Sequence, residues 1–241
     1  MRSAGALTAL DDLSARGVVS RASSAPLARH RMLEVAPALR SVLPRGGLQR
    51  GEVVACAGVA AVSMAMAVAA GPSQEGSWVA WAGVPGVNAA ALHQMGVALD
   101  RTLWVGGAEG GADWSDALGG DVLAALVDGV DLIVVGPETR TVRPATARRV
   151  IARLQARGAV MLAIDQPVFG ADVRLDTAGS VWEGLGAGHG LARERSVEVA
   201  VSGRRAARSE RHACRLPGES GAVDVVSRGP MAGLARGRGA C

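Results

Sequence analysis

The sequence predicts an α/β protein with a mostly parallel sheet, helices on both faces of that sheet, and antiparallel hairpins near the C-terminus. Three observations indicate this fold. From Gly51 onward, short apolar runs alternate with segments of helix length, as in sheets built from strand–helix–strand units. After Gly170 the apolar runs follow one another without long helices between them, which is typical of hairpins. Hydrophobic residues make up 49% of the 241 residues, enough to bury the core of one main domain.

The first 42 residues are predicted to form a helical segment and a linker that precede the main domain. Residues 3–16 begin with a serine that can cap a helix and carry leucines on one side, which indicates a helix. Residues 17–31 are rich in Ser, Ala and Arg and are expected to form the linker. A second helical stretch, interrupted by Pro37, is expected at residues 32–42.

Strands and helices are predicted to alternate through the middle of the chain. The expected strands are residues 52–57, 77–82, 102–105, 131–135 and 160–164. The expected helices are residues 60–70, 87–98, 114–127 and 144–157, the last with proline at its start and Gly158 at its end. Trp78, Trp81 and Trp104 fall on predicted strands and are expected in the core, whereas the pattern does not decide the place of Trp114 and Trp182.

The part of the chain after Gly170 is predicted to extend one edge of the sheet. The expected strands are residues 172–176, 181–185, 195–201, 211–216 and 222–226, joined by glycine-containing turns. Residues 227–241 are rich in Gly and Arg and are predicted to be a disordered basic tail. The main domain is therefore assigned to residues 43–226.

Composition and charge narrow the class of protein. The net charge is +4, the pI is near 10, and all 26 basic residues are arginines, which favours an acidic partner or nucleic acid. Aromatic residues make up 2% of the chain, too few for a platform that stacks single-stranded bases. The uncharged run 53–70 is better explained by a buried strand and helix than by a membrane span. We expect a cytoplasmic protein without membrane contact, associated with the nucleoid if it binds DNA.

The cysteines and histidines do not form a recognisable metal site. Cys56, Cys214 and Cys241 have neither metal-binding spacing nor the pattern of a small disulfide framework. The histidines at positions 30, 93, 189 and 212 share no ligand spacing with them. We therefore expect no metal, no cofactor and a reducing compartment.

Several segments resemble the RecA recombinase family, in the order in which that family has them. Residues 46–51, followed by an apolar strand and Gly58, resemble the entry to its phosphate-binding loop. Residues 95–100 resemble the segment ahead of its third core strand, and residues 131–135 resemble its Walker B strand. Residues 164–166 and 173–176 resemble later strands of its sheet. The resemblance covers about residues 43–226 and implies a RecA-like P-loop NTPase core.

The departures from this family fall on the residues that would handle ATP. The glycine, lysine and threonine of the phosphate-binding loop align with Ser63, Met64 and Ala65, so the phosphate counter-ion and the Mg²⁺-binding hydroxyl are both missing. The resemblance places a catalytic glutamate at Val84 and the metal-organising aspartate at Gly136. Together with Gly58 these positions form a vestigial nucleotide site. The expectation is a pseudo-ATPase with no catalytic residues.

A shortened RecA-like protein without an ATP site resembles the ImuA-type accessory proteins of actinobacterial SOS mutagenesis. The two loops that carry DNA in RecA are reduced here to residues 137–143 and 166–170. The resemblance implies a non-catalytic adaptor in DNA-damage-induced translesion synthesis. Its implied partners are an ImuB-type inactive homologue of Y-family polymerases and an error-prone polymerase.

Two arginine clusters are the candidate sites for contact with DNA or a partner. The first comprises Arg140, Arg143, Arg148, Arg149, Arg153 and Arg157, with Glu138 as the acid near it in the sequence. Arg149, Arg153 and Arg157 are spaced by four and are expected to form one stripe on a helix. The second cluster, at a predicted hairpin tip, comprises Arg204, Arg205, Arg208 and Arg211. Either cluster can equally be a solvated surface.

These clusters define the main alternative function, a DNA-binding module that uses arginines without ATP hydrolysis. Binding that falls steeply with salt would favour this alternative over the adaptor. A regulator of cell division on the same fold is a third alternative, but no residue of the sequence supports it.

Overall fold

The fold is described from a computed structural model, which covers residues 32–106, 114–185, 190–204, 209–218 and 222–228. The predicted helix 3–16, the linker 17–31 and residues 229–241 of the predicted tail lie outside the described residues. The first two residues of the predicted tail, 227 and 228, instead belong to the strand β11 (Asp224–Arg228). In the described part of the chain, no helix combines the length and the apolar character that crossing a membrane requires.

Nine strands form one sheet within the described residues. They are β3 (Val53–Gly58), β4 (Val79–Ala82), β5 (Thr102–Val105), β6 (Leu132–Val135), β7 (Val160–Ile164), β8 (Val173–Leu185), β9 (Gly190–Ser202), β10 (Glu210–Arg215) and β11 (Asp224–Arg228). Their order across the sheet is β11-β10-β9-β8-β3-β7-β6-β4-β5. The strands from β5 to β8 are parallel, and β8 to β11 are antiparallel. The predicted mostly parallel α/β sheet with antiparallel C-terminal strands is thus confirmed.

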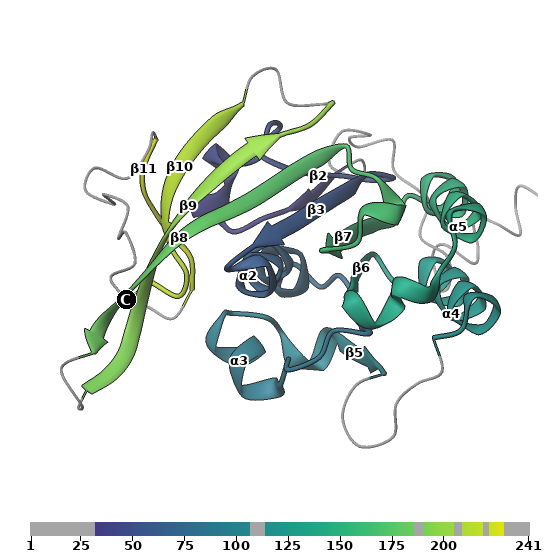
Figure 1. The fold of residues 1–241 in the computed structure, drawn as a ribbon, viewed down its shortest axis with the longest axis horizontal. Coiled ribbons are helices and arrows are strands. Elements are labelled where there is room, and N and C mark those ends of the chain that lie inside the picture. The colour runs from purple at the N-terminus through teal and green to yellow at the C-terminus, as the bar shows by residue number, and fades with distance from the viewer. Residues whose placement is uncertain (1–31, 107–113, 186–189, 205–208, 219–221, 229–241) are drawn as a thin grey trace, which may run out of the picture. The chain divides into compact units, whose positions relative to one another are not determined.

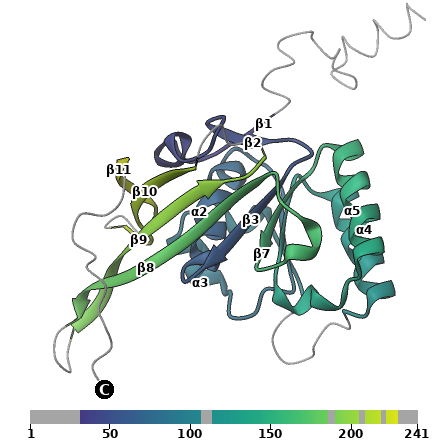
Figure 2. The ribbon, with the colours of Figure 1, turned by 45° about the horizontal axis from the view of Figure 1, so that its top comes forward.

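Helices pack on both faces of the parallel part (Figures 1 and 2). Alternate residues of a strand point to opposite faces, and accordingly Val54 and Val53 of β3 belong to different core clusters. On one face lie α2 (Ala61–Gln74) and α3 (Ala89–Gln94). On the other face α4 (Asp116–Gly129) and α5 (Pro144–Arg157) pack against β6 and β7.

The predicted helical stretch at residues 32–42 is wrong. Strand β1 (Met32–Glu34) pairs with β2 (Gly47–Gln49), and only the short 3₁₀ helix η2 (Pro37–Ser41) follows. Proline disfavours helical backbone in the residue before it, so Ala36 is extended and the chain turns there. This segment packs on α2, where Gly71 provides the space: a Cβ at Gly71 would lie 2.5 Å from the backbone of Ala36.

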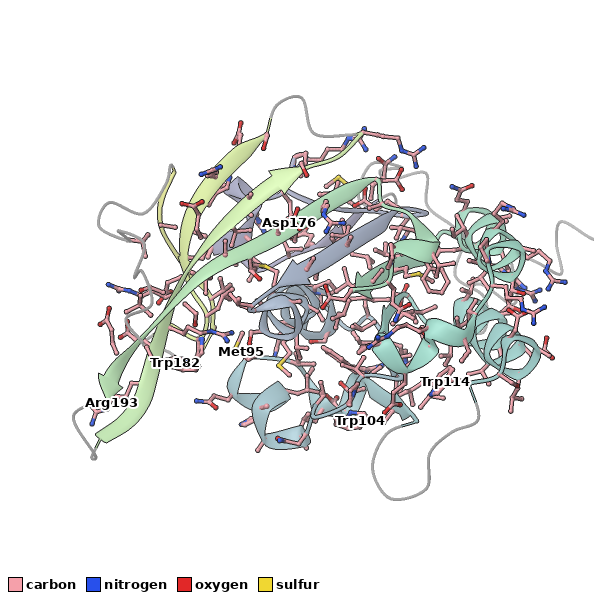
Figure 3. The ribbon with its side chains drawn as sticks, in the orientation of Figure 1. Met95, Trp104, Trp114, Asp176, Trp182 and Arg193 are labelled. Atoms are coloured by element: carbon pink, nitrogen blue, oxygen red, sulfur yellow. The ribbon has the colours of Figure 1, made fainter. Side chains whose placement is uncertain are left out.

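Several other elements differ from the predicted limits. The predicted helix 87–98 is reduced to α3 (Ala89–Gln94). Helix α2 continues four residues beyond Ala70, through Pro72, to Gln74. The two predicted strands 172–176 and 181–185 form the single strand β8, which with β9 makes a long hairpin. Trp182 and Arg193 lie on the part of this hairpin that extends beyond the neighbouring strands (Figure 3).

The prediction that Trp78 and Trp104 lie in the core is wrong. Trp81 on β4 is 1% exposed, as expected, but Trp78 is 38% exposed and Trp104 is 43% exposed. Trp104 belongs to β5, the last strand of the sheet, as Figure 3 shows. Periodicity indicates a strand but not its place in the sheet, and an edge strand has fewer neighbours to cover it.

Candidate functional site

The carboxyl ends of the parallel strands meet at one edge of the sheet, the usual place for a ligand in α/β proteins. The predicted nucleotide-site residues Gly58, Val84 and Gly136 follow or end β3, β4 and β6. Asp165 follows β7 at the same edge. The structure therefore brings together residues that are far apart in the sequence, as the vestigial-site prediction requires.

The loop from β3 to α2 is hydrogen-bonded to β8. Thr177 of β8, which is 4% exposed, accepts hydrogen bonds from two loop amides. The Ala60 N–H donates to Thr177 Oγ1 at 2.9 Å and the Val59 N–H donates to the Thr177 carbonyl at 3.2 Å. Gly58, at φ +89°, passes so close to Thr177 that a Cβ would collide with this carbonyl. Amides that could otherwise surround a phosphate are thus used inside the protein.

In the first turn of α2, the side chains of Met64 and Ala65 point into the core. Met64 and Ala65 are both 0% exposed, and the Met64 side chain belongs to the cluster between α2 and the sheet. The Met64 N–H donates to the Ala60 carbonyl at 2.8 Å, as the first turn of an α-helix requires. Neither residue presents a group that could bind phosphate or Mg²⁺.

Arg195 of β9 occupies the space beside this helix start. Its guanidinium donates to Ser63 Oγ at 2.6 Å and to the Leu216 carbonyl at 2.9 Å. The same group lies 5.1 Å from the centre of the Trp182 ring, a cation–π distance. Partial burial lowers the pKa of Arg195, although an arginine stays charged at neutral pH. Ser63, expected only as a vestigial position, is therefore part of a contact between α2 and the C-terminal hairpin.

The ends of β4 and β6 close against each other at Gly136. A Cβ at Gly136 would lie 2.6 Å from Val84 Cα and would collide with the Gly83 carbonyl. The Gly136 N–H donates to the Ala82 carbonyl at 2.8 Å, and the Gln166 side chain donates to the Gly136 carbonyl at 2.9 Å. An aspartate does not fit at position 136, and Val84 is only 6% exposed.

Trp114 covers the same edge from the side of α4 (Figure 3). It is 6% exposed, and its ring fills the space above Gly83 and Gly106, where β4 and β5 end. The Trp114 carbonyl accepts a hydrogen bond from Thr141. The sequence did not decide between core and surface for this residue, and the structure places it in the core beside Val135 and Val142.

A cavity of about 280 Å³ remains between β3 and the chain that follows β7. Asp165, at φ +49°, Gln166 and Arg174 line it together with small apolar residues. Arg174 is bound to Asp176 of its own strand at 2.8 Å. Burial and the nearby Asp165 charge raise the pKa of the Cys56 thiol to about 12, so this cysteine is no nucleophile at neutral pH. In the described ranges no three His, Cys, Asp or Glu residues are placed to hold a metal ion.

The first arginine cluster lies on the exposed side of α5 and the preceding loop, but part of its charge is paired. Arg153 and Arg157 both bind Asp128 of α4, with Nε distances of 2.7 and 2.9 Å. These two guanidinium groups lower the pKa of Asp128 to about 2. Arg149 donates to Thr146 Oγ1 at 3.1 Å and, with Arg153, lines a hollow of about 400 Å³ between α4 and α5. The stripe is where periodicity predicted it.

The other members of this cluster make local contacts. Arg140 donates to the Pro137 carbonyl at 3.1 Å, and the Arg143 N–H donates to Asp116 at 2.7 Å. Arg148 lies exposed on α5. The sequence offered only Glu138 as a nearby acid, because Asp128 and Asp116 approach through the fold.

The second cluster is also paired where it is described. Arg204 lies 3.3 Å from Asp172, and Arg211 lies 3.2 Å from Glu198. Arg205 and Arg208 lie outside the described residues. A role for either cluster in binding DNA or a partner stays a prediction.

The fold and this edge define an α/β protein in which backbone and side chains fill the ends of β4 and β6, while a cavity remains between β3 and the chain that follows β7. The chain belongs to the MT3502 N-terminal domain family, whose model matches residues 41–169, more than half of the 241 residues. It is also 32% identical over 113 residues to the uncharacterized protein Rv3395c of Mycobacterium tuberculosis (strain ATCC 25618 / H37Rv). That match covers 47% of this chain and 52% of the relative, so the chain spans about half the length of the curated relative.

Proposed function

We propose that the protein is a non-catalytic RecA-like accessory protein of DNA-damage-induced translesion synthesis. It acts as an adaptor through contacts with an ImuB-type inactive polymerase homologue, and through it with an error-prone polymerase. The observation that carries the non-catalytic part is the closed strand edge, where Gly136 has no room for a carboxylate and Met64 is buried. The partners come from the resemblance described above.

The placement of the RecA-like segments supports this core assignment. Strands β3 and β6, which resemble the phosphate-binding and Walker B strands, run parallel in one sheet with β7 between them. Their carboxyl ends therefore share one edge, as a nucleotide site needs. Losses at Met64, Val84 and Gly136 thus fall on one place in space rather than on three unrelated surfaces.

The free energy of the fold favours a loop whose buried amide groups are hydrogen-bonded within the protein. A buried amide without a hydrogen-bond partner costs roughly 1–3 kcal/mol, and the Thr177 side chain removes that cost at Ala60. A nucleotide would have to break these bonds and would meet no lysine and no metal-binding hydroxyl. Contact with other proteins is a function that needs no ligand at this edge.

Nucleotide binding tests the non-catalytic part. We expect the wild-type protein to show no Mg²⁺-dependent ATP turnover, and Met64→Lys to gain none, because the new ammonium would enter the core rather than a phosphate site. Phosphate release and binding of a fluorescent ATP analogue would be measured for both proteins. Turnover in the wild type that depends on Mg²⁺ would overturn the proposal.

Recovery of partners tests the adaptor part. The tagged protein would be purified from DNA-damaged cells of its own species, with and without nuclease, and its partners identified by mass spectrometry. We expect a polymerase homologue in stoichiometric amount that survives nuclease. Loss of all partners with the DNA would instead favour the DNA-binding alternative. The first variants to test would then be Arg148→Ala and Arg143→Ala, because neither arginine side chain forms an ion pair within the described residues.

A further inference from the structure

Strand β5 ends the parallel side of the sheet, and among the described residues no strand pairs with its outer edge. It pairs with β4 on one side and is the last strand of the sheet order. Four large apolar side chains lie exposed on or next to it, and we call them the β5 edge: Trp78 (38%), Leu99 (37%), Leu103 (40%) and Trp104 (43%). Such an edge attracts other strands unless it is protected.

Strand β5 is short, with four residues, but two of the usual protections are absent from its sequence. Its sequence, Thr-Leu-Trp-Val, has no charge and no proline, although inward charges and prolines are the common means of blocking an edge. The opposite edge strand, β11, has a charged residue at each end, Asp224 and Arg228. The two edges of one sheet therefore differ, and only β5 has the composition of a pairing strand.

The exposed side chains lie on both faces of the sheet. This arrangement decides which kind of element, a helix or a strand, can bind to the β5 edge. Trp104 is in register with Trp81, whose side chain packs on the face of α2. Leu103 is next in the strand and points to the other face. A helix laid on one face would leave the other uncovered, whereas an added strand covers both.

The backbone of β5 is also oriented for an added strand. The Gly83 N–H donates to the Val105 carbonyl at 2.9 Å, so the polar backbone groups of Val105 and Leu103 point to β4. Because these groups alternate along a strand, those of Trp104 point away from the sheet. An incoming strand can exchange hydrogen bonds with Trp104.

We propose that this strand is β5 of a second copy of the chain, paired antiparallel about a two-fold axis normal to the sheet. The charged residues near β5, Asp100 and Arg101, both lie before its first residue. Antiparallel pairing keeps these charges of the two copies at opposite ends, whereas parallel pairing would place like charges side by side. The axis passes between the two copies of either Leu103 or Trp104, so that this residue pairs with its own copy. Only then do paired side chains lie on the same face of the joined sheet.

The size of the edge sets the strength of the dimer. Four side chains of this size exposed to about 40% supply roughly 300 Å² per copy, and standard stable interfaces bury about 800 Å² per partner. With the paired backbone and its surroundings added, the interface is at the small end of the range. The dimer is therefore reversible and depends on protein concentration.

Sedimentation velocity of the full chain across micromolar concentrations tests the proposal. We expect a monomer–dimer equilibrium, at least a tenfold weaker association for Trp104→Arg, and no change for the control Val226→Arg, which lies on β11 and is 56% exposed. Circular dichroism and thermal unfolding would establish that both variants fold. A wild type that stays monomeric at about 100 µM, or equal weakening by both substitutions, would overturn the proposal.

Cysteine cross-linking provides a readout that does not depend on affinity. In a Cys241→Ser background, Leu103→Cys and Trp104→Cys place a thiol on either candidate axis, where Cβ atoms of paired residues lie about 5 Å apart. Cys56 and Cys214 are buried and do not compete. We expect one variant to form a reducible dimer on mild oxidation and Val226→Cys to form none; failure of both would contradict the paired strands. This inference stands independently of the adaptor function.

Discussion

Gly136 has space for a hydrogen atom and nothing more. It follows the apolar strand β6 beside Gly83 and Val84, and the neighbouring atoms belong mainly to the backbone of the chain that leaves β4. A carboxylate there would be buried next to a carbonyl oxygen without a metal to neutralise it. This single position therefore links the proposed absence of an ATP site to the stability of the fold.

Gly136→Asp is expected to destabilise the protein by at least about 3 kcal/mol, because it combines overpacking with a buried charge. Gly136→Ala should lose somewhat less, since only the collision remains. The matched control is Gly129→Ala at the end of α4, where no atom lies within 4 Å of the added Cβ. Urea denaturation of the three variants checks this, and a stable Gly136→Asp protein would mean that the edge can open.

The inward direction of the Arg195 side chain could be predicted from the sequence. Val197, Val199 and Val201 are buried on β9, and alternation places Arg195 on the same face of the strand. The strand pattern therefore indicated an inward arginine. Its contacts with Ser63 and Leu216 could not be predicted, because they depend on how a strand pairs with residues far away in sequence.

Helices α4 and α5 are held together at one end by an ion-pair network. Asp128 of α4 binds Arg153 and Arg157 of α5. Each pair at a surface contributes little by itself, but one carboxylate bound by two guanidinium groups fixes the relative position of the two helices. The arginine stripe consequently has a structural partner within the fold.

This network predicts a pH dependence of stability. The pKa of Asp128 is about 2 in the folded protein, below its ordinary value of 3.8. The contribution of Asp128 is therefore fully present above pH 4 and is lost as the pH falls from about 4 to about 2. Asp128→Asn should be less stable than the wild type at pH 7, and the difference should shrink across that range.

Urea denaturation at several pH values would measure this difference. Asp121→Asn, an exposed carboxylate on the same helix, is the control and should not reproduce it. A constant difference between wild type and Asp128→Asn down to pH 2 would show that the ion pairs do not form in solution.

Most elements could be predicted from local pattern. Strand β7 and helix α5 have the limits that periodicity gave, and the α5 stop at Gly158 has the expected left-handed backbone. Residues 32–42 could not be predicted in this way, because a short apolar segment with one proline suits a strand, a turn or a helix equally. Packing against Gly71 of α2 decides its structure.

At the scale of the whole molecule, the class of fold was predictable and the order of strands was not. Alternating strands and helices indicated a parallel sheet, but nothing local pairs Val54 of β3 with Val173 of β8. For the same reason Trp104 was expected in the core. The position of β5 at the edge, and the exposed surface that follows from it, emerge only when all strands are placed.

The closed strand edge depends on residues from outside the shared domain. The family model ends at residue 169, yet Thr177 and Arg195, which hold the loop and the first turn of α2, belong to β8 and β9. The region matched by the family model thus contains the loop and the first turn of α2, and the C-terminal hairpin supplies the side chains that are hydrogen-bonded to them. Two members of the family with similar N-terminal domains are comparable at this site only when their C-terminal strands are compared as well.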